Sequence, residues 1–187
     1  CNLTNTAPLE LFLEEFGRNG RFLRQCFQQF FTEELLEFFA ARGLQTVVER
    51  GGRCFPASGR ALDVVHVLKT WLRELGVELR CSSRVTEILV ENQGVQGLVS
   101  TAGRLKSDNL ILATGGKSYP KTGSTGEGYA LLEKLGHTIT SLSPALVPLS
   151  TNHPGLDGLE GLLLRNTGVR VFIDGKRRAQ SFGEVEF

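Results

Sequence analysis

The stretch Asn109–Gly128 constrains the fold more than any other part of the chain. It begins with the apolar run Leu110–Ala113, which has no polar alternation and therefore predicts a short strand buried on both faces. The run stops at Thr114-Gly115-Gly116, where two glycines allow a sharp turn and the close approach of another group. A loop rich in Ser, Thr and Gly then leads into a helical pattern from Glu127. Ligands of α/β sheets bind beyond the carboxyl ends of strands, and helix N-termini attract anions. The stretch thus suits a phosphate-bearing cofactor, although a plain strand–turn connection would use similar residues.

Composition limits the classes of protein that this chain can represent. Its 187 residues are enough for one sizeable domain, or for a domain and part of another. Hydrophobic residues make up 41% and charged residues 22%, as in ordinary globular proteins. The formal net charge of +1 provides no electrostatic footprint for nucleic acid or an anionic membrane, so we expect neither as a partner. No apolar run approaches the roughly 18 residues that a membrane-spanning helix needs.

The cysteines predict neither a metal site nor a disulfide framework. Cys1, Cys26, Cys54 and Cys81 form no Cys-x-x-Cys pair and no zinc-ligand spacing. We find no secretory signal in the sequence, and reduced thiols are typical of the cytoplasm. We therefore expect a cytoplasmic protein without a bound metal.

Helical patterns dominate the first 75 residues. Apolar residues recur at helical spacing after Pro8, between residues 22 and 30, and from Thr32 to a stop at Gly43. A longer helix carries Leu62, Val65, Leu68, Leu72 and Leu75 on one expected apolar face. Eight of the twelve phenylalanines lie between residues 12 and 39. Such a cluster is more typical of a hydrophobic core than of a ligand-lining surface.

Strand patterns follow in short antiparallel groups. Thr46–Glu49 and Arg53–Phe55 predict a hairpin that turns at two glycines. Strands are also expected at Val77–Cys81, Val85–Glu91 and Val95–Ser100. Near the end of the chain, Asp174-Gly175 is a good two-residue turn signal for a further hairpin, between residues 169–173 and 176–180.

Four motifs together resemble one family. Residues 111–129 read Ile-Leu-Ala-Thr-Gly-Gly-Lys-Ser-Tyr-Pro-Lys-Thr-Gly-Ser-Thr-Gly-Glu-Gly-Tyr, which resembles the same segment of the YhiN/BaiN-like flavoproteins, the aminoacetone-oxidase-like FAD-binding enzymes. Cys-Asn-Leu-Thr-Asn at 1–5, Gly-Arg-Cys-Phe-Pro-Ala-Ser at 52–58 and Pro-Ala-Leu-Val-Pro-Leu at 144–149 resemble three other motifs of that family.

The resemblance implies an α/β fold. Residues 1–144 would form part of the FAD domain of a two-dinucleotide-binding-domain flavoprotein, without its first dinucleotide-binding unit. Residues 145–187 would begin an inserted β-rich substrate domain. The chain contains no Gly-x-Gly-x-x-Gly, the sequence whose loop holds the FAD pyrophosphate in such proteins. We therefore expect the 187 residues to be a central fragment that is inactive alone and binds FAD weakly or not at all.

The resemblance also implies which residues contact the cofactor. Cys1, Asn2 and Asn5 correspond to a loop beside the flavin, and the backbone of Val85 to a strand that pairs with the adenine ring. Thr114, Gly115 and Gly116 follow the strand expected at 110–113. Arg53 is a candidate for a substrate carboxylate or a flavin carbonyl, and equally for an ordinary solvated arginine of a hairpin.

The expected activity is that of an FAD-dependent oxidoreductase acting on a small organic substrate, with NAD(P)H as a candidate electron donor. The flavin carries the redox step in such enzymes, and the sequence has no nucleophile–base pair or carboxylate cluster, so no catalytic residue is nominated. One alternative is a nucleotide- or cofactor-binding module without catalysis, based on the same glycines. Another is a structural role in association. The sequence predicts no oligomeric state.

Overall fold

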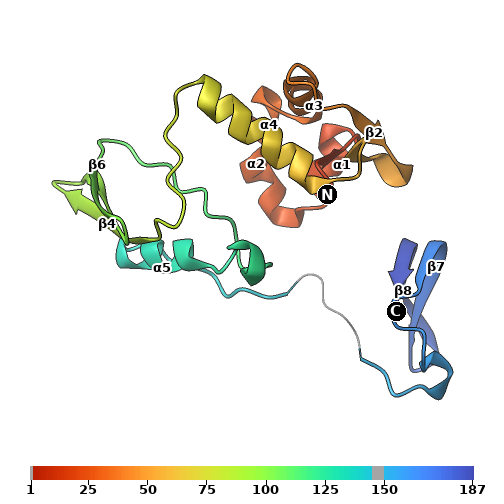
Figure 1. Ribbon diagram of the computed structural model, residues 1–187. Helices are drawn as coiled ribbons and strands as arrows, with labels where there is room; N and C mark the ends of the chain where they lie inside the picture. Colours follow the sequence, from red (N-terminus) through yellow and green to blue (C-terminus); the bar gives the residue numbers. More distant parts are fainter. Residues whose placement is uncertain (1, 145–149) are drawn as a thin grey trace. The chain divides into compact units, whose positions relative to one another are not determined.

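The computed structural model describes residues 2–144 and 150–187. The chain divides into two compact units, residues 1–110 and residues 111–187 (Figure 1). We predicted a domain boundary between residues 144 and 145. Residues 145–149, with most of the Pro-Ala-Leu-Val-Pro-Leu motif, lie outside the described residues, and that boundary stays a prediction.

Four helices fill the first part of unit 1, as the apolar patterns predicted: α1 (Leu9–Glu14), α2 (Gly20–Gln29), α3 (Thr32–Ala40) and α4 (Ala61–Glu74). At the start of α3, the Glu34 carboxylate accepts a hydrogen bond of 2.9 Å from the backbone N–H of Phe31. This bond satisfies one of the helix's unpaired N–H groups and holds the pKa of Glu34 below its ordinary value.

The phenylalanine-rich region is only partly core: of its eight phenylalanines Phe39 is buried, and Phe12, Phe27, Phe31 and Phe38 are half-buried. Phe12 meets Phe27 and Phe31 edge-to-face, with ring centroids 5.5 and 5.1 Å apart. A neighbouring core contains the buried Phe39, Leu44 and Val64. Phe16 is exposed, and so is most of the apolar stripe predicted between residues 22 and 30, with Phe22 83% and Phe30 49% exposed.

Helix α4 packs through a different face from the one that we predicted. Val64 is buried, and Val67 packs beside it against the core. Trp71, one turn further on, meets Phe38 of α3 at 4.8 Å between ring centroids. The expected face is largely solvent-exposed, with Leu62 71% and Leu75 58% exposed. The helix has apolar residues on two sides, and the side with the bulky indole buries more area against α3.

A small antiparallel sheet joins the beginning of the chain to the 52–58 motif. Its strand order is β1 (Thr4–Asn5), β3 (Arg53–Pro56) and β2 (Thr46–Val48), shown beside the helices in Figure 1. The β2–β3 pairing confirms the predicted hairpin. Cys54 lies at its centre with no exposed surface, and its burial raises the pKa of the thiol.

We expect Cys54 to react at least about tenfold more slowly than Cys26 and Cys81 with iodoacetamide at pH 8, because the thiolate is the nucleophile and burial disfavours it. Cys26 and Cys81 are both exposed. Peptide mass mapping over time would give the three rates separately. Labelling of Cys54 at the rate of Cys26 in the folded chain would contradict this burial, and unfolding in urea should equalise the rates.

A second antiparallel sheet has the order β4 (Val85–Glu91), β5 (Gly94–Ser100) and β6 (Gly103–Lys106). The first two strands confirm the predictions from the sequence. The strand predicted at Val77–Cys81 is wrong, since residues 77–80 have no strand pairing and residue 81 begins a turn. Val77 and Leu79 are exposed, so these apolar side chains have no sheet partner to pack against.

Unit 2 begins with the 110–128 region and contains α5 (Glu127–Lys134) and a long hairpin. The hairpin pairs β7 (Leu163–Ile173) with β8 (Lys176–Glu186). Asp174 and Gly175 form its turn, each with a positive φ, as the Asp-Gly signal predicted. Both strands are longer than the sequence pattern indicated.

The buried strand predicted at Leu110–Ala113 is not formed. The segment carries no strand pairing, and Ile111 is 92% exposed. A strand buried on both faces needs neighbouring strands on either side, whereas every strand pair among the described residues is antiparallel and lies elsewhere. The prediction of a buried strand here is therefore wrong for the described residues, because an apolar run does not by itself supply the neighbouring strands that would bury it.

Candidate functional site

The glycine turn after residue 113 folds back against the loop and helix that follow it. Gly115 has a φ of +71°, a left-handed conformation that suits glycine. A Cβ atom built on Gly115 would lie 3.4 Å from Ser124 Oγ, and one on Gly116 would lie 3.4 Å from Tyr129 Oη. Residues separated by nine and thirteen positions therefore meet at this turn.

The intervening loop is held by its own hydrogen bonds. A short 3₁₀ turn spans Pro120–Thr122, and Thr122 Oγ1 donates to Tyr119 O at 2.9 Å. The backbone N–H of Ser124 donates to the same carbonyl oxygen at 3.2 Å. These bonds return the chain to α5, which begins at Glu127 with a carboxylate in its first turn. A phosphate at this helix N-terminus would meet that negative charge, so the predicted phosphate position at the helix start is poorly supported.

Helix α5 is fixed to the 112–114 segment through Gly128. Gly128 is buried, and the nearest atom to a Cβ built on it is Thr114 Oγ1, with Leu112 Cδ2 at 3.6 Å. Only a residue without a side chain lets the helix backbone approach so closely. The strand-like segment, the glycine turn and α5 thus form one local structure.

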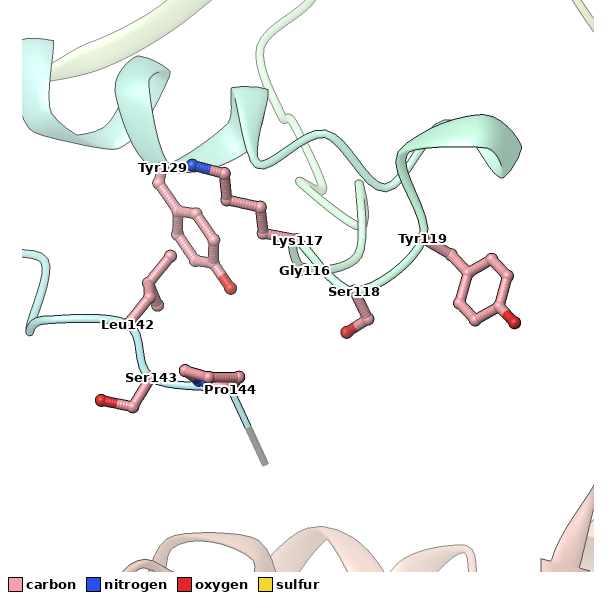
Figure 2. Close-up of a pocket in the computed structure, with 8 residues that line it drawn as sticks. All are labelled: Gly116, Lys117, Ser118, Tyr119, Tyr129, Leu142, Ser143 and Pro144. Carbon is pink, nitrogen blue, oxygen red and sulfur yellow. The ribbon is translucent and has the colours of Figure 1, made fainter. Parts of the chain in front are cut away.

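A pocket of about 660 Å³ opens beside this structure. It is lined by Gly116, Lys117, Ser118, Tyr119, Tyr129, Leu142, Ser143 and Pro144. Figure 2 shows the hydroxyl groups of Tyr129 and Ser118 directed into the space that Leu142 and Pro144 face. The Tyr119 ring points away from that space in the same view.

The other residues expected at the cofactor lie in unit 1. Cys1 is outside the described residues, and Asn2 is exposed. The Asn5 side chain is used internally: Nδ2 donates to Gly51 O at 2.7 Å, and Oδ1 accepts from Ala7 N at 2.8 Å. The β1–β3 pairing places Asn5 opposite Arg53, so the structure brings the 1–5 and 52–58 motifs together.

We expect Asn5→Ala to lower the free energy of unfolding by about 1–2 kcal/mol, because it removes two hydrogen bonds that connect β1 to its surroundings. Asn2→Ala is the matched control, since Asn2 is exposed, and should change stability by less than about 0.5 kcal/mol. Urea unfolding of both variants measures the difference. Equal, near-zero effects would show that the Asn5 bonds contribute nothing to folding.

Val85 and Arg53 also have defined places. Val85 is the first residue of β4, and β4 is an edge strand of its sheet. Alternate backbone groups of an edge strand face away from the sheet, which suits backbone pairing with a base. The Arg53 guanidinium contacts Glu49 at 3.5 Å and lies over the Phe55 ring, as an ordinary hairpin arginine would.

The sequence reasoning missed the pocket residues. Lys117, Ser118 and Tyr129 stood in the quoted motif without a role. One signal could have found them: the chain has two tyrosines, Tyr119 and Tyr129, and both fall in that motif. Among residues 2–144 and 150–187, no three His, Cys, Asp or Glu side chains are grouped as metal ligands, and no helix is long and apolar enough to cross a membrane.

The chain matches a known protein family over almost its full length. A model of the HI0933-like protein Rossmann domain matches residues 1–185, so the chain belongs to the HI0933-like family. It is a Rossmann-type domain of a flavin oxidoreductase family, which confirms the resemblance to the YhiN/BaiN-like flavoproteins and the α/β class.

Three curated relatives extend this result. The chain is 38% identical over 155 residues to the 3-dehydro-bile acid delta(4,6)-reductase of Clostridium scindens, covering 82% of this chain and 37% of that protein. It is 25% identical over 154 residues to the ribosomal RNA dihydrouridine synthase of Haemophilus influenzae, covering 80% of this chain and 37% of the relative. The Escherichia coli protein of the same name is 24% identical over 165 residues, covering 87% of this chain and 40% of the relative. The matched region thus spans well under half of each relative.

Proposed function

We propose that this chain is the central portion of a cytoplasmic, FAD-dependent reductase that saturates a carbon–carbon double bond conjugated with a carbonyl group. The observation that carries the proposal is the match to the bile acid reductase over 82% of the chain. Both activities named among the relatives are reductions of such a bond. A 3-oxo-4-ene steroid and the uracil ring share a C=C–C=O unit, and FAD chemistry with NAD(P)H as electron donor suits its reduction.

The residues of unit 2 fit one wall of a cofactor site. Thr114 and Gly115 are exposed residues, and the left-handed turn at Gly115 suits the close approach of a ligand. The proposed contacts in unit 1 are the exposed Asn2, the half-buried Asn5 and the edge-strand backbone of Val85. When bound, the flavin would supply the hydride equivalent, and the protein would hold the substrate carbonyl and exclude competing acceptors.

A small organic molecule remains the preferred substrate class. The identity to the bile acid reductase is 38%, against 24–25% to the two ribosomal RNA enzymes. The formal net charge of +1 also gives no electrostatic support for a nucleic-acid partner or a membrane. Ribosomal RNA is the second candidate, since two relatives carry that activity in their names.

The test uses the full-length protein that contains this chain. We expect it to purify yellow, to be bleached by NAD(P)H or dithionite, and to be reoxidised by air. It should then reduce 4-androstene-3,17-dione, whereas turnover of a uridine-containing ribosomal RNA transcript instead would establish the second candidate. A colourless protein that takes up no added FAD would refute the reductase and favour a nucleotide- or cofactor-binding module without catalysis. The 187-residue chain alone is expected to retain less than stoichiometric FAD.

A further inference from the structure

The two inward-facing hydroxyl groups of the unit 2 pocket form a donor pair for a ligand. Tyr129 Oη comes from α5 and Ser118 Oγ from the segment after the glycine turn, and both point into the same space (Figure 2). Within the described part of the chain, neither hydroxyl has a hydrogen-bond partner. Hydroxyl donors at the edge of an apolar pocket fix the orientation of a ligand oxygen.

The chemistry of the pocket selects a neutral ligand. The Lys117 stem packs within 3.4 Å of the position that a Gly126 Cβ would occupy, and Figure 2 shows its amino group turned away from the two hydroxyls. Leu142, Pro144 and the Tyr129 ring provide apolar walls. With the Lys117 amino group directed away from the two hydroxyls, a carboxylate or phosphate gains little there, whereas an uncharged carbonyl keeps its hydrogen bonds and buries apolar area.

We propose that Tyr129 and Ser118 are the residues that bind the conjugated carbonyl oxygen of the substrate, in the pocket bounded by Leu142 and Pro144. This assignment rests on the proposed reductase function and adds its substrate-binding and catalytic groups. The volume of about 660 Å³ is within the range of small-molecule sites, and both a steroid enone and a uracil ring carry the required carbonyl.

The reaction explains why donors at that oxygen matter. In the reduction of an enone, the C=C π bond breaks as a C–H bond forms at the β-carbon, and a bound reduced flavin would supply the hydride equivalent. The displaced electron pair passes through the α-carbon to the carbonyl oxygen, which becomes an enolate. A proton from solvent then adds to the α-carbon, and the ketone reforms. Tyr129 Oη and Ser118 Oγ donate to the oxygen throughout, and their bonds strengthen as its negative charge develops.

The binding test exploits the fact that both tyrosines of the chain line this pocket. The 187-residue chain labelled with 3-fluorotyrosine gives two ¹⁹F signals, which Tyr119→Phe assigns. The probes are 4-androstene-3,17-dione, uridine and riboflavin. We expect the Tyr129 signal to shift in a saturable way with one of the first two, and the responding probe identifies the source of the carbonyl. No shift with either probe, or saturation by riboflavin at lower concentration, would overturn the assignment.

Matched variants separate binding from folding. Tyr129→Phe should weaken binding of the responding probe about tenfold, measured by isothermal titration calorimetry, since it removes one hydrogen bond and keeps the ring. Ser118→Ala should weaken binding of the same probe severalfold. Tyr119→Phe should leave the affinity within twofold, because that ring points away (Figure 2). Unchanged affinity in Tyr129→Phe would refute the donor role.

The catalytic role of Tyr129 is tested in the full-length protein. Tyr129→Phe should lower kcat about 100-fold while flavin content stays normal, as expected for loss of one donor to a developing oxyanion. A normal kcat in a flavin-loaded Tyr129→Phe variant would refute the catalytic role of Tyr129, but it would leave the proposed reductase function unaffected. A full-length protein without flavin would instead refute the reductase, and the ¹⁹F result on the isolated chain would be unaffected.

Discussion

Gly97→Ala is expected to unfold most of the β4–β5–β6 sheet, at a cost of about 4 kcal/mol. Gly97 has a φ of +137°, which a residue with a Cβ adopts only with strain of about 1–3 kcal/mol. A Cβ built there would also lie 2.9 Å from the carbonyl carbon of Leu105 and 2.9 Å from Lys106 Cα, atoms of the paired strand β6. Because these are backbone atoms, no side-chain rotation relieves the clash, and overpacking adds about 1–3 kcal/mol.

Gly94 provides the matched control in the same strand. Its φ is not positive, and the nearest atom to a Cβ there is Glu91 O at 3.6 Å, an ordinary contact. Gly94→Ala should therefore change the free energy of unfolding by less than about 1 kcal/mol. Hydrogen exchange should become fast across β4–β6 in Gly97→Ala alone. If both variants exchange as the wild type does, the close approach at Gly97 is not a feature of the folded chain.

Patterns of local origin were predicted well from the sequence. Helices α1 to α5 follow from apolar spacing and stop signals within each segment. The β7–β8 hairpin follows from Asp174-Gly175, since two adjacent positive φ values are what a two-residue hairpin turn needs. The phenylalanine-rich core is partly local as well, because α1 and α2 are neighbours in the chain. Each of these elements is determined by interactions that its own residues make.

Elements that depend on distant partners were not predictable in the same way. Val77–Cys81 and Leu110–Ala113 have the composition of strands, yet neither forms one among the described residues. A strand exists through its ladder of hydrogen bonds with a neighbour, and composition does not specify that neighbour. The prediction of the buried face of α4 was wrong for a related reason. The periodicity of α4 allows two apolar faces, and only the position of Phe38 selects the face that contains Trp71.

Only part of the candidate site could be predicted from the sequence. The glycine turn at Gly115 was found from sequence, because glycine pairs mark positions of unusual backbone geometry. The pocket residues were not, since Tyr129 reaches the turn only after the 117–126 loop folds back on itself. The 1–5 and 52–58 motifs were recognised separately, and the β1–β3 pairing that joins them is a tertiary contact between distant segments.

Gly128→Ala is expected to destabilise the 112–128 region by about 2–3 kcal/mol, and the second substitution Thr114→Ala should reverse the sign of this effect. The nearest atom to the new Cβ is Thr114 Oγ1, while Thr114 Cβ is 3.5 Å away and leaves enough room once the hydroxyl is removed. With the clash absent, alanine within α5 is favoured over glycine by about 0.5–1 kcal/mol, so the double variant should equal or exceed the wild type.

Urea unfolding of the wild type, both single variants and the double variant gives this cycle, with an expected coupling of about 3 kcal/mol. Thr114→Ala alone is the control and should change stability by less than about 0.5 kcal/mol, because Thr114 is exposed. Additive effects would mean that α5 does not rest on Thr114. The same proteins, prepared at full length, also test the cofactor contact: if Thr114 Oγ1 binds the flavin, Thr114→Ala and the double variant should lose flavin equally, although only Gly128→Ala loses stability.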